Sequence, residues 1–403
     1  MRRLTLSLAA VVLLSSIVLS RSTADFDPFR AEILADAESL ALVGGAVVIV
    51  DRGESRVWTF GTSDAERRIP VDPDTLFSTG SIAKPLIAFW LDQQQFDTSI
   101  TLNALWPDLE IGQAGLVTVA QAIDQTSGFP RDDSAWVGRT VDPEGAAAIL
   151  RQYTPVAPAG ERFTYNSVVF ALAARGAARD LGMAIPWMPD GERPATPFEL
   201  ALAGDLAAIE SFDHGVMSAA VDARVNATQL EALLPDLIAW ANDDGSVRLG
   251  GDAPERSCCP LGRSLRYANG WFVEQFEGYD VFSHLGSAIG GTAVVMVVPE
   301  LALGVAVLVN QDHSEAFVHA TRYKIVLRAL GRDTRAADVL VRRAQAQRAA
   351  WAALAAELGV EGEPIGYGAL TWPTATVPGS DRCRIVLRGP LLGQYIGTDC
   401  TKP

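Results

Sequence analysis

Ser81 and Lys84 have the types and the spacing of a nucleophile and its base. A helix is expected to begin at Ser81, and a separation of three residues places both side chains on one helix face. The start of a helix gathers backbone N–H groups and positive dipole where negative charge can develop. A lysine that is partly removed from water can lose its proton and activate the serine hydroxyl. The pair predicts covalent catalysis through serine, although Ser-x-x-Lys on its own also arises by chance.

The sequence around this pair, residues 44–130, resembles the serine β-lactamase and penicillin-binding protein family, and within it the class C β-lactamase-like branch. Residues 45–50 resemble the first hairpin strand of that branch, and residues 73–77 resemble the stretch before its Ser-x-x-Lys acylation motif. Residues 125–130, Gln-Thr-Ser-Gly-Phe-Pro, resemble a segment of the family for which a structural role is expected. The resemblance extends over about residues 28–331 and implies a β-lactamase/transpeptidase-like fold.

Tyr165 corresponds to the tyrosine of the family's second motif, at about the family's distance from Ser81. The resemblance implies that Tyr165 exchanges protons with Lys84; the alternative is that it only packs at the start of a core helix. The family has asparagine two residues after this tyrosine, whereas this chain has Ser167, and Asn166 comes one place early. A hydroxyl lacks the second polar group of an amide, so we expect a different contact with the substrate or the lysine.

His284 begins a His-Leu-Gly-Ser sequence that resembles the His-x-Gly variant of the third motif. The resemblance implies that His284 and Gly286 line the substrate site. It also implies that the backbone N–H groups of Ser81 and Ser287 bind the oxyanion. The alternative is that His284 is an ordinary polar strand residue. Leu285 lacks the threonine hydroxyl of the family, and histidine is a weaker cation than lysine near neutral pH, so the variant favours ester, amide or peptide substrates over efficient penicillin hydrolysis.

The elements that must position these residues follow from hydrophobic periodicity and turn residues. Predicted helices cover residues 28–42, 81–91, 118–125, 145–152, 168–181, 229–242 and 316–330. Predicted strands cover residues 46–51, 56–60, 267–275, 279–284, 291–298 and 303–309. Strands near both ends of this region with helices between them predict an α+β fold, in which helices flank one antiparallel sheet and a mainly helical subdomain adjoins it.

Composition and motif searches exclude several other functions. The net charge of −15 and the lack of a basic stripe argue against nucleic acid as a partner. The sequence has no Gly-x-Ser-x-Gly nucleophile elbow, phosphate loop or dinucleotide fingerprint. Its four histidines are not paired at helical metal-binding spacing, so we expect neither a metal nor another cofactor.

The N-terminus has the pattern of a secretory signal peptide. Met1-Arg2-Arg3 precedes a mostly apolar run over residues 4–19, and small residues lead to a predicted cleavage site after Ala24. A membrane anchor is the alternative, but a run of 16 apolar residues is short for a span. We therefore expect residues 1–24 to be removed, no membrane span in the mature chain, and a periplasmic or secreted protein.

Export to an oxidising compartment would let the four cysteines pair. Cys258 and Cys259 are adjacent and bridge poorly to each other, because the Cα atoms of a disulfide lie further apart than one residue step. The favoured bridge is Cys383–Cys400, which closes a short C-terminal loop. A bridge from either tail cysteine back to Cys258 or Cys259 is the alternative.

The sequence thus predicts three parts: a signal peptide over residues 1–24, a catalytic domain over 25–332 and a C-terminal extension over 333–403. The extension begins with a helix to about Leu358. The predicted function is hydrolysis of an ester or amide, in a small molecule or a peptide, through an acyl-serine intermediate. Two alternatives stay open: a D,D-peptidase that acts on cell-wall peptide, and a β-lactamase-like binding or regulatory module without turnover.

Overall fold

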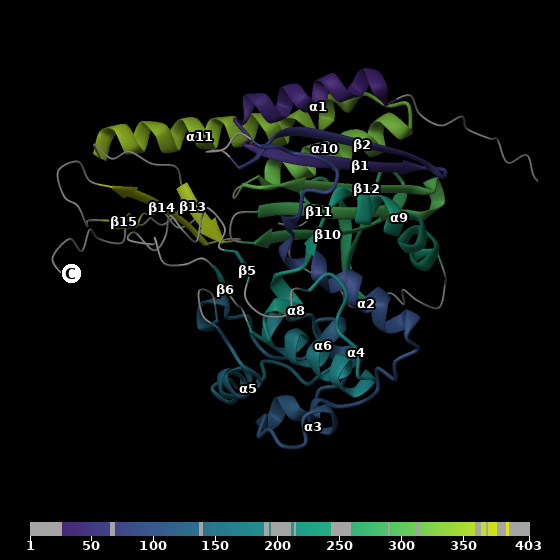
Figure 1. Ribbon diagram of the computed structural model, residues 1–403, viewed down its shortest axis with the longest axis vertical. Helices are drawn as coiled ribbons and strands as arrows, with labels where there is room; N and C mark the ends of the chain where they lie inside the picture. Colours follow the sequence, from purple (N-terminus) through teal and green to yellow (C-terminus); the bar gives the residue numbers. More distant parts are fainter. Residues whose placement is uncertain are drawn as a thin grey trace, which may run out of the picture.

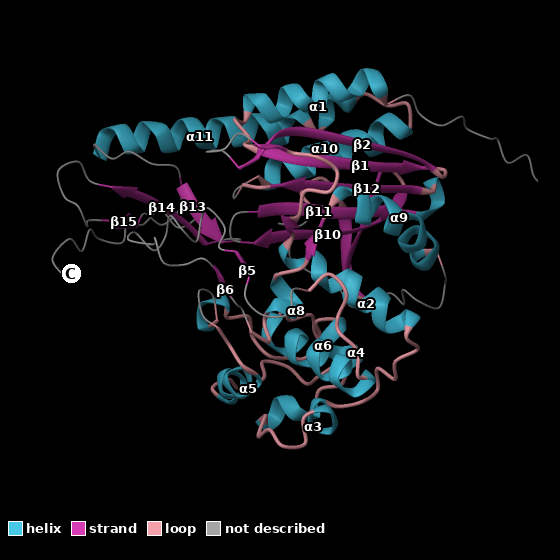
Figure 2. Cartoon of the chain, in the orientation of Figure 1, coloured by secondary structure: helices cyan, strands magenta, loops and turns pink. Residues whose placement is uncertain are grey.

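A computed structural model describes the chain over residues 26–64, 69–136, 140–188, 193–194, 211–212, 215–242, 259–288, 291–311, 314–358, 364–367, 370–376 and 384–386. An eight-stranded antiparallel sheet forms its centre, with helices on both faces and a helical region beside it (Figures 1 and 2). The predicted α+β architecture, an antiparallel sheet flanked by helices with a mainly helical region beside it, is therefore confirmed.

The central sheet joins strands from residues 44–70 with strands from residues 263–309. Strand β1 pairs with β12, so that Val47 lies opposite Val307, and the other neighbours are antiparallel as well. In spatial order the strands are β3 (Ile69–Pro70), β2 (Glu54–Asp64), β1 (Gly44–Asp51), β12 (Leu303–Val309), β11 (Gly291–Val298), β10 (Tyr279–Ala288), β9 (Trp271–Phe276) and β8 (Arg263–Ala268).

Two hydrophobic clusters cover the two faces of this sheet. Alternate residues of β1 point to opposite faces, so Val48 belongs to one cluster and Val47 to the other. On the side of Val47 lie α1 (Asp27–Ser39) and α10 (Glu315–Ala329); on the side of Val48 lie α9 (Ala227–Ala241) and the helical region (Figure 1). This explains why β1, β11 and β12 read as continuous apolar runs: both of their faces are buried.

The helical region lies below β10 in Figure 1 and carries part of the larger cluster, including Phe129, Trp136 and Phe170. Its helices are α2 (Ala83–Gln93), α3 (Leu102–Leu105), α4 (Val119–Ile123), α5 (Pro143–Arg151), α6 (Ser167–Leu181) and α8 (Ser218–Val221). Short 3₁₀ turns η1 (Gly80–Ile82), η2 (Gly112–Leu116) and η3 (Asp133–Ala135) connect them. Elsewhere, η5 (Pro299–Leu301) precedes β12, and β4 (Phe77–Ser78) pairs with β7 (Arg224–Val225), as β5 (Arg193–Pro194) does with β6 (Ser211–Phe212).

One predicted strand is wrong. Residues 267–275 form parts of two strands, β8 and β9, because a tight turn at Asn269 and Gly270 divides them. Both turn residues have positive φ angles, 48° and 77°. Asn-Gly is a strong hairpin signal, since a two-residue turn with positive φ matches the twist of the strands. The sequence contains this Asn-Gly signal, but the predicted strand runs through it.

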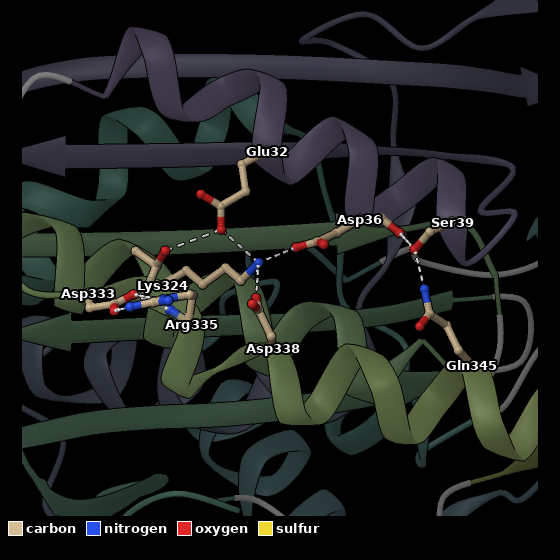
Figure 3. A network of polar contacts seen from close by, with 9 residues as sticks. Glu32, Asp36, Ser39, Lys324, Asp333, Arg335, Asp338 and Gln345 are labelled. Atoms are coloured by element: carbon tan, nitrogen blue, oxygen red, sulfur yellow. Dashed lines mark hydrogen bonds and ion pairs between the residues drawn. The ribbon is translucent and has the colours of Figure 1, made fainter.

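The C-terminal helix packs beside the N-terminal helix (Figure 1). After η6 (Thr334–Ala336), α11 (Asp338–Leu358) runs next to α10 and past α1. Figure 3 shows Lys324 of α10 between Glu32 and Asp36 of α1 and Asp338 of α11, at 2.8, 2.7 and 2.7 Å. One buried ammonium group thus joins three helices. Strands β13 (Pro364–Tyr367), β14 (Leu370–Thr376) and β15 (Arg384–Val386) form a small separate sheet.

Several predictions fall on other parts of the chain. The signal peptide over residues 1–24, Cys258 and the bridge Cys383–Cys400 all lie outside the described residues. Cys259 is described and carries a buried free thiol, while its possible partners Cys383 and Cys400 lie outside the described residues. Among the described helices, none combines the length and the apolar character needed to cross a membrane.

Candidate active site

Ser81 lies in the 3₁₀ turn η1, directly before α2, rather than in the first turn of an α-helix as predicted. The turn is anchored from behind by Thr79, whose backbone N–H and hydroxyl both donate to the carbonyl of Ala223, at 2.9 and 2.7 Å. The Ser81 side chain is half-buried at the junction between the sheet and the helical region. Its position before a helix keeps the expected backbone N–H groups near the hydroxyl.

Lys84 is fully buried in the first turn of α2. Its Nζ donates to Ser81 Oγ at 3.0 Å, to Ser167 Oγ at 3.4 Å and to the carbonyl of Ala220 in α8 at 2.9 Å. All three acceptors are uncharged, and among the described residues no carboxylate forms an ion pair with Lys84. Burial therefore lowers the pKa of Lys84 from its ordinary value to about 7, with a smaller opposing effect from Asp133.

Tyr165 completes the group at the nucleophile. Its hydroxyl donates to Ser81 Oγ at 2.9 Å, and its ring lies 4.9 Å from Lys84 Nζ. Ser81 Oγ thus contacts two groups that can take up or return a proton. The structure brings together the three residues that the sequence proposed as catalytic, from η1, α2 and the segment before α6.

The segment over residues 125–130 fixes the backbone beside Tyr165. Gln125 Oε1 accepts from the backbone N–H of Asn166 at 2.5 Å, and Gly128 N donates to Thr164 Oγ1 at 3.0 Å. Asn166 Nδ2 donates in turn to the carbonyl of Pro130 at 2.8 Å. These bonds clamp the chain on both sides of Tyr165, which is what a structural role for this segment predicts.

Asn166 and Ser167 have different roles at the start of α6. Asn166 is the N-cap: its Oδ1 accepts from the backbone N–H of Val169 at 2.9 Å, which satisfies one free donor of the helix. Ser167, the first helical residue, is buried and directs its hydroxyl to Lys84. The short Ser167 side chain therefore contacts the base.

His284 is buried in β10, with 1% of its surface exposed. Its Nδ1 lies 2.7 Å from the carbonyl oxygen of Leu285; since a carbonyl only accepts, Nδ1 carries the proton, and Nε2 accepts from the Tyr267 hydroxyl at 3.3 Å. Burial, together with the nearby Lys84, lowers the pKa of His284 to about 3. The ring packs against Tyr165 at 6.2 Å between centroids. His284 is thus a neutral, buried neighbour of Tyr165, and its expected place at the substrate site stays a prediction.

The end of β10 passes very close to the nucleophile turn. A Cβ atom on Gly286 would lie 1.8 Å from the carbonyl oxygen of Thr79, and one on Gly80 would lie 2.5 Å from that of Ser287. Only glycine fits at either position, because any side chain would push the strand away. The Ser287 hydroxyl points instead to Glu315, at 3.3 Å. Strand and turn are therefore close enough for their backbone amides to face one substrate atom.

The structure adds site residues that the sequence reasoning missed. Arg131 lies with its Cζ 4.9 Å from the centroid of the Tyr165 ring, and its Nε and Nη2 contact Asp133 Oδ2 at 2.7 Å. The charged sequence directly after Pro130 was the available signal. The carbonyl of Ala220 had none, since a backbone acceptor leaves no mark on residue type. Among the described residues, no group of three or more His, Cys, Asp or Glu side chains is placed to hold a metal ion.

Comparisons with known proteins concern the family and the fold. A family model described as Beta-lactamase matches residues 29–185. A class C β-lactamase from Rhodobacter sphaeroides is 18% identical, with 75% of this chain and 98% of that chain covered and a TM-score of 0.54. An octameric penicillin-binding protein homologue from Pyrococcus abyssi is 16% identical, with 88% and 89% covered and a TM-score of 0.59. A D-amino acid amidase from Ochrobactrum anthropi is 16% identical, with 76% and 98% covered and a TM-score of 0.55. No curated protein matches this chain as a relative.

These matches confirm the resemblance predicted from the sequence. The family model includes Ser81, Lys84 and Tyr165, and the structural likeness, at this low identity, establishes the fold. That fold is shared by serine hydrolases with different substrates, which include β-lactamases, a D-alanine carboxypeptidase and an amidase.

Proposed function

We propose that this protein is an exported serine hydrolase that cleaves an ester or amide through an acyl-enzyme on Ser81. The observation that carries the proposal is Lys84: it is buried without an ion-pair partner among the described residues, has a pKa near 7, and lies 3.0 Å from the hydroxyl that it would deprotonate. A lysine in this state is a base at neutral pH, whereas an ordinary lysine is not.

The first half-reaction acylates the serine. The neutral Nζ of Lys84 takes the proton of Ser81 Oγ, and Oγ attacks the carbonyl carbon of the substrate. The backbone N–H groups of Ser81 and Ser287 would hold the oxyanion, a contribution of about 10²–10³-fold for each donor. Tyr165 then donates its proton to the leaving group and regains one from Lys84 as the tetrahedral intermediate collapses.

The second half-reaction releases the acyl group. Water enters, gives a proton to the same Tyr165–Lys84 pair and attacks the acyl carbon, and Ser81 leaves as the alcohol. Another nucleophile in place of water would make the reaction a transfer. This chemistry needs neither a metal nor an organic cofactor.

The third motif bears on the substrate. Neutral, buried His284 offers no positive charge to a penicillin carboxylate, and Leu285 packs against the hydrophobic cluster on the other face of the sheet. Both features favour ester, amide or peptide substrates over penicillins; a D,D-peptidase activity on cell-wall peptide is a narrower form of the same proposal. Export to the periplasm or medium rests on the N-terminal signal pattern alone.

Intact-mass spectrometry tests the proposal. Mature protein is treated with a fluorophosphonate and, separately, with a penicillin, beside Ser81→Ala. We expect one fluorophosphonate adduct per chain that is lost in Ser81→Ala, and weak or no penicillin adduct. Ser78→Ala is the matched control, because Ser78 lies three residues away with its hydroxyl bound to Asp222 at 3.3 Å, and it should label like the wild type. Folded protein without either adduct would refute the proposal and favour a binding or regulatory module.

A further inference from the structure

The geometry points to Arg131 as a specificity-determining residue that binds a negatively charged group, such as a carboxylate, on the acyl part of the substrate. This inference rests on the proposed function and deepens it, because it names a chemical class of substrate. It also gives a role to a residue outside the three sequence motifs.

Arg131 is placed one side chain away from the nucleophile. Its guanidinium carbon and Lys84 Nζ each lie 4.9 Å from the centroid of the Tyr165 ring, and the hydroxyl of that ring contacts Ser81 Oγ. The Arg131 side chain is 38% exposed, whereas Lys84 is fully buried. A substrate bound to Ser81 would therefore have a partly exposed cation, Arg131, on the far side of one aromatic ring.

Two other basic groups described beside Tyr165, Lys84 and His284, do not suit this task. Lys84 must be neutral to act as a base, and burial lowers the pKa of His284 to about 3, so His284 is neutral near pH 7. An arginine stays protonated throughout this range and presents a planar set of donors that matches a carboxylate. The chain as a whole carries a charge of −15, so long-range attraction does not favour an anionic substrate and a local contact is needed.

The loop that carries Arg131 is held in place from several sides. Asp133, itself only 11% exposed, binds one edge of the guanidinium through Nε and Nη2. Asp132 accepts a hydrogen bond from the Tyr153 hydroxyl, and the Pro130 carbonyl accepts one from Asn166. A guanidinium fixed in this way loses little freedom when it binds an anion, which is the arrangement expected of a recognition residue.

Two esters that differ in a single group test the inference: p-nitrophenyl hexanoate and p-nitrophenyl hydrogen adipate, in which a carboxylate replaces the terminal methyl group. We expect the wild type to have the higher kcat/KM for the adipate, and salt to reduce the preference. Arg131→Gln should lower the adipate-to-hexanoate ratio about tenfold, the size of a charged hydrogen bond at a partly exposed site, and Arg131→Lys should keep part of it. Arg151→Gln is the matched control, because Arg151 forms a comparable pair with Glu144 away from the site and should keep the wild-type ratio.

Several results would overturn the inference. A ratio unchanged in Arg131→Gln, or equal losses on both esters, would show that Arg131 acts through Tyr165 or through folding. A wild-type preference for the ammonium-bearing aminocaproate ester would assign recognition to Asp133 instead. Intact mass separates these cases from failure of the proposed function: if neither ester nor the fluorophosphonate modifies Ser81, both proposals fall together. If Arg131→Gln does not fold, the salt dependence of the wild-type ratio and the Arg131→Lys variant still decide.

Discussion

Two buried lysines, Lys84 and Lys324, lie in surroundings that shift their pKa values in opposite directions. Both have at most 1% of their surface exposed. Lys84 contacts two hydroxyls and a carbonyl, and burial lowers its pKa to about 7. Lys324 contacts the carboxylates of Glu32, Asp36 and Asp338, which raise its pKa above the ordinary value despite the cost of burial (Figure 3).

The difference shows that burial alone does not decide the proton affinity of a lysine. Uncharged acceptors leave the desolvation of the ammonium uncompensated, so the proton is lost easily and the amine becomes a base. Carboxylates compensate for desolvation, so the ammonium is kept and holds helices together. The first environment makes the lysine a base, and the second makes it part of a structural ion pair. Replacing each lysine by methionine should therefore reduce activity at the first site and stability at the second.

Lys84→Met should have the largest effect, and it should fall on activity. Loss of the general base is expected to slow acylation by about 10²–10⁴-fold. The free energy of unfolding should be kept or raised, because the variant no longer buries an amine that is partly charged. Stopped-flow acylation with a p-nitrophenyl ester and urea unfolding measure the two quantities. A variant that acylates at the wild-type rate would remove Lys84 from the mechanism.

Lys324→Met should have the reverse effect. It leaves three carboxylates clustered without their cation, and we expect a loss of about 2–3 kcal/mol in the free energy of unfolding, less than for fully buried acids because these are partly exposed. Acylation by the folded variant should match the wild type. Gln345→Ala is the control at the contact between α11 and α1, since it removes an exposed 3.0 Å hydrogen bond to Ser39 and should cost no more than about 0.5 kcal/mol. Equal losses in the two variants would contradict a special role for Lys324.

The sequence predicts only part of this contrast. It contains three lysines, and the Ser-x-x-Lys spacing singles out Lys84 as a base. Nothing near Lys324 in the sequence indicates an ion-pair centre, because Glu32 and Asp36 lie almost three hundred residues earlier and only the fold brings them together. Local spacing carries information within a helix, whereas a contact between α1 and α10 depends on how the strands that separate them in the sequence form the sheet.

The difference between local and long-range contacts also explains which parts of the fold and the site the sequence predicts. The buried strands and long helices follow from periodicity, and the α+β fold follows from their order. The hairpin turn at Asn269 and Gly270 was predictable and missed. The neutral state of His284 was not predictable, because it depends on burial under Tyr267 and Tyr165, which comes from tertiary packing. The nearness of Arg131 to Tyr165 depends in the same way on how the loop closes.

A single carboxylate placed beside Lys84 should convert it towards the state of Lys324. Ser167 Oγ lies 3.4 Å from Lys84 Nζ, so Ser167→Asp brings a negative charge into contact with the base. An adjacent anion favours the protonated lysine and raises its pKa from about 7, so the neutral base forms only at higher pH. Because each unit of pKa reduces the neutral fraction about tenfold, acylation at pH 7 should fall about tenfold or more and recover as the pH rises. The wild-type rate should rise with pH and level off above about 7.

Ser167→Asn, which adds an uncharged side chain of similar size, is the control and should keep the wild-type inflection. An inflection that stays in place in Ser167→Asp would mean that the rate does not report the ionisation of Lys84, and the contrast between the two lysines would then have no bearing on catalysis.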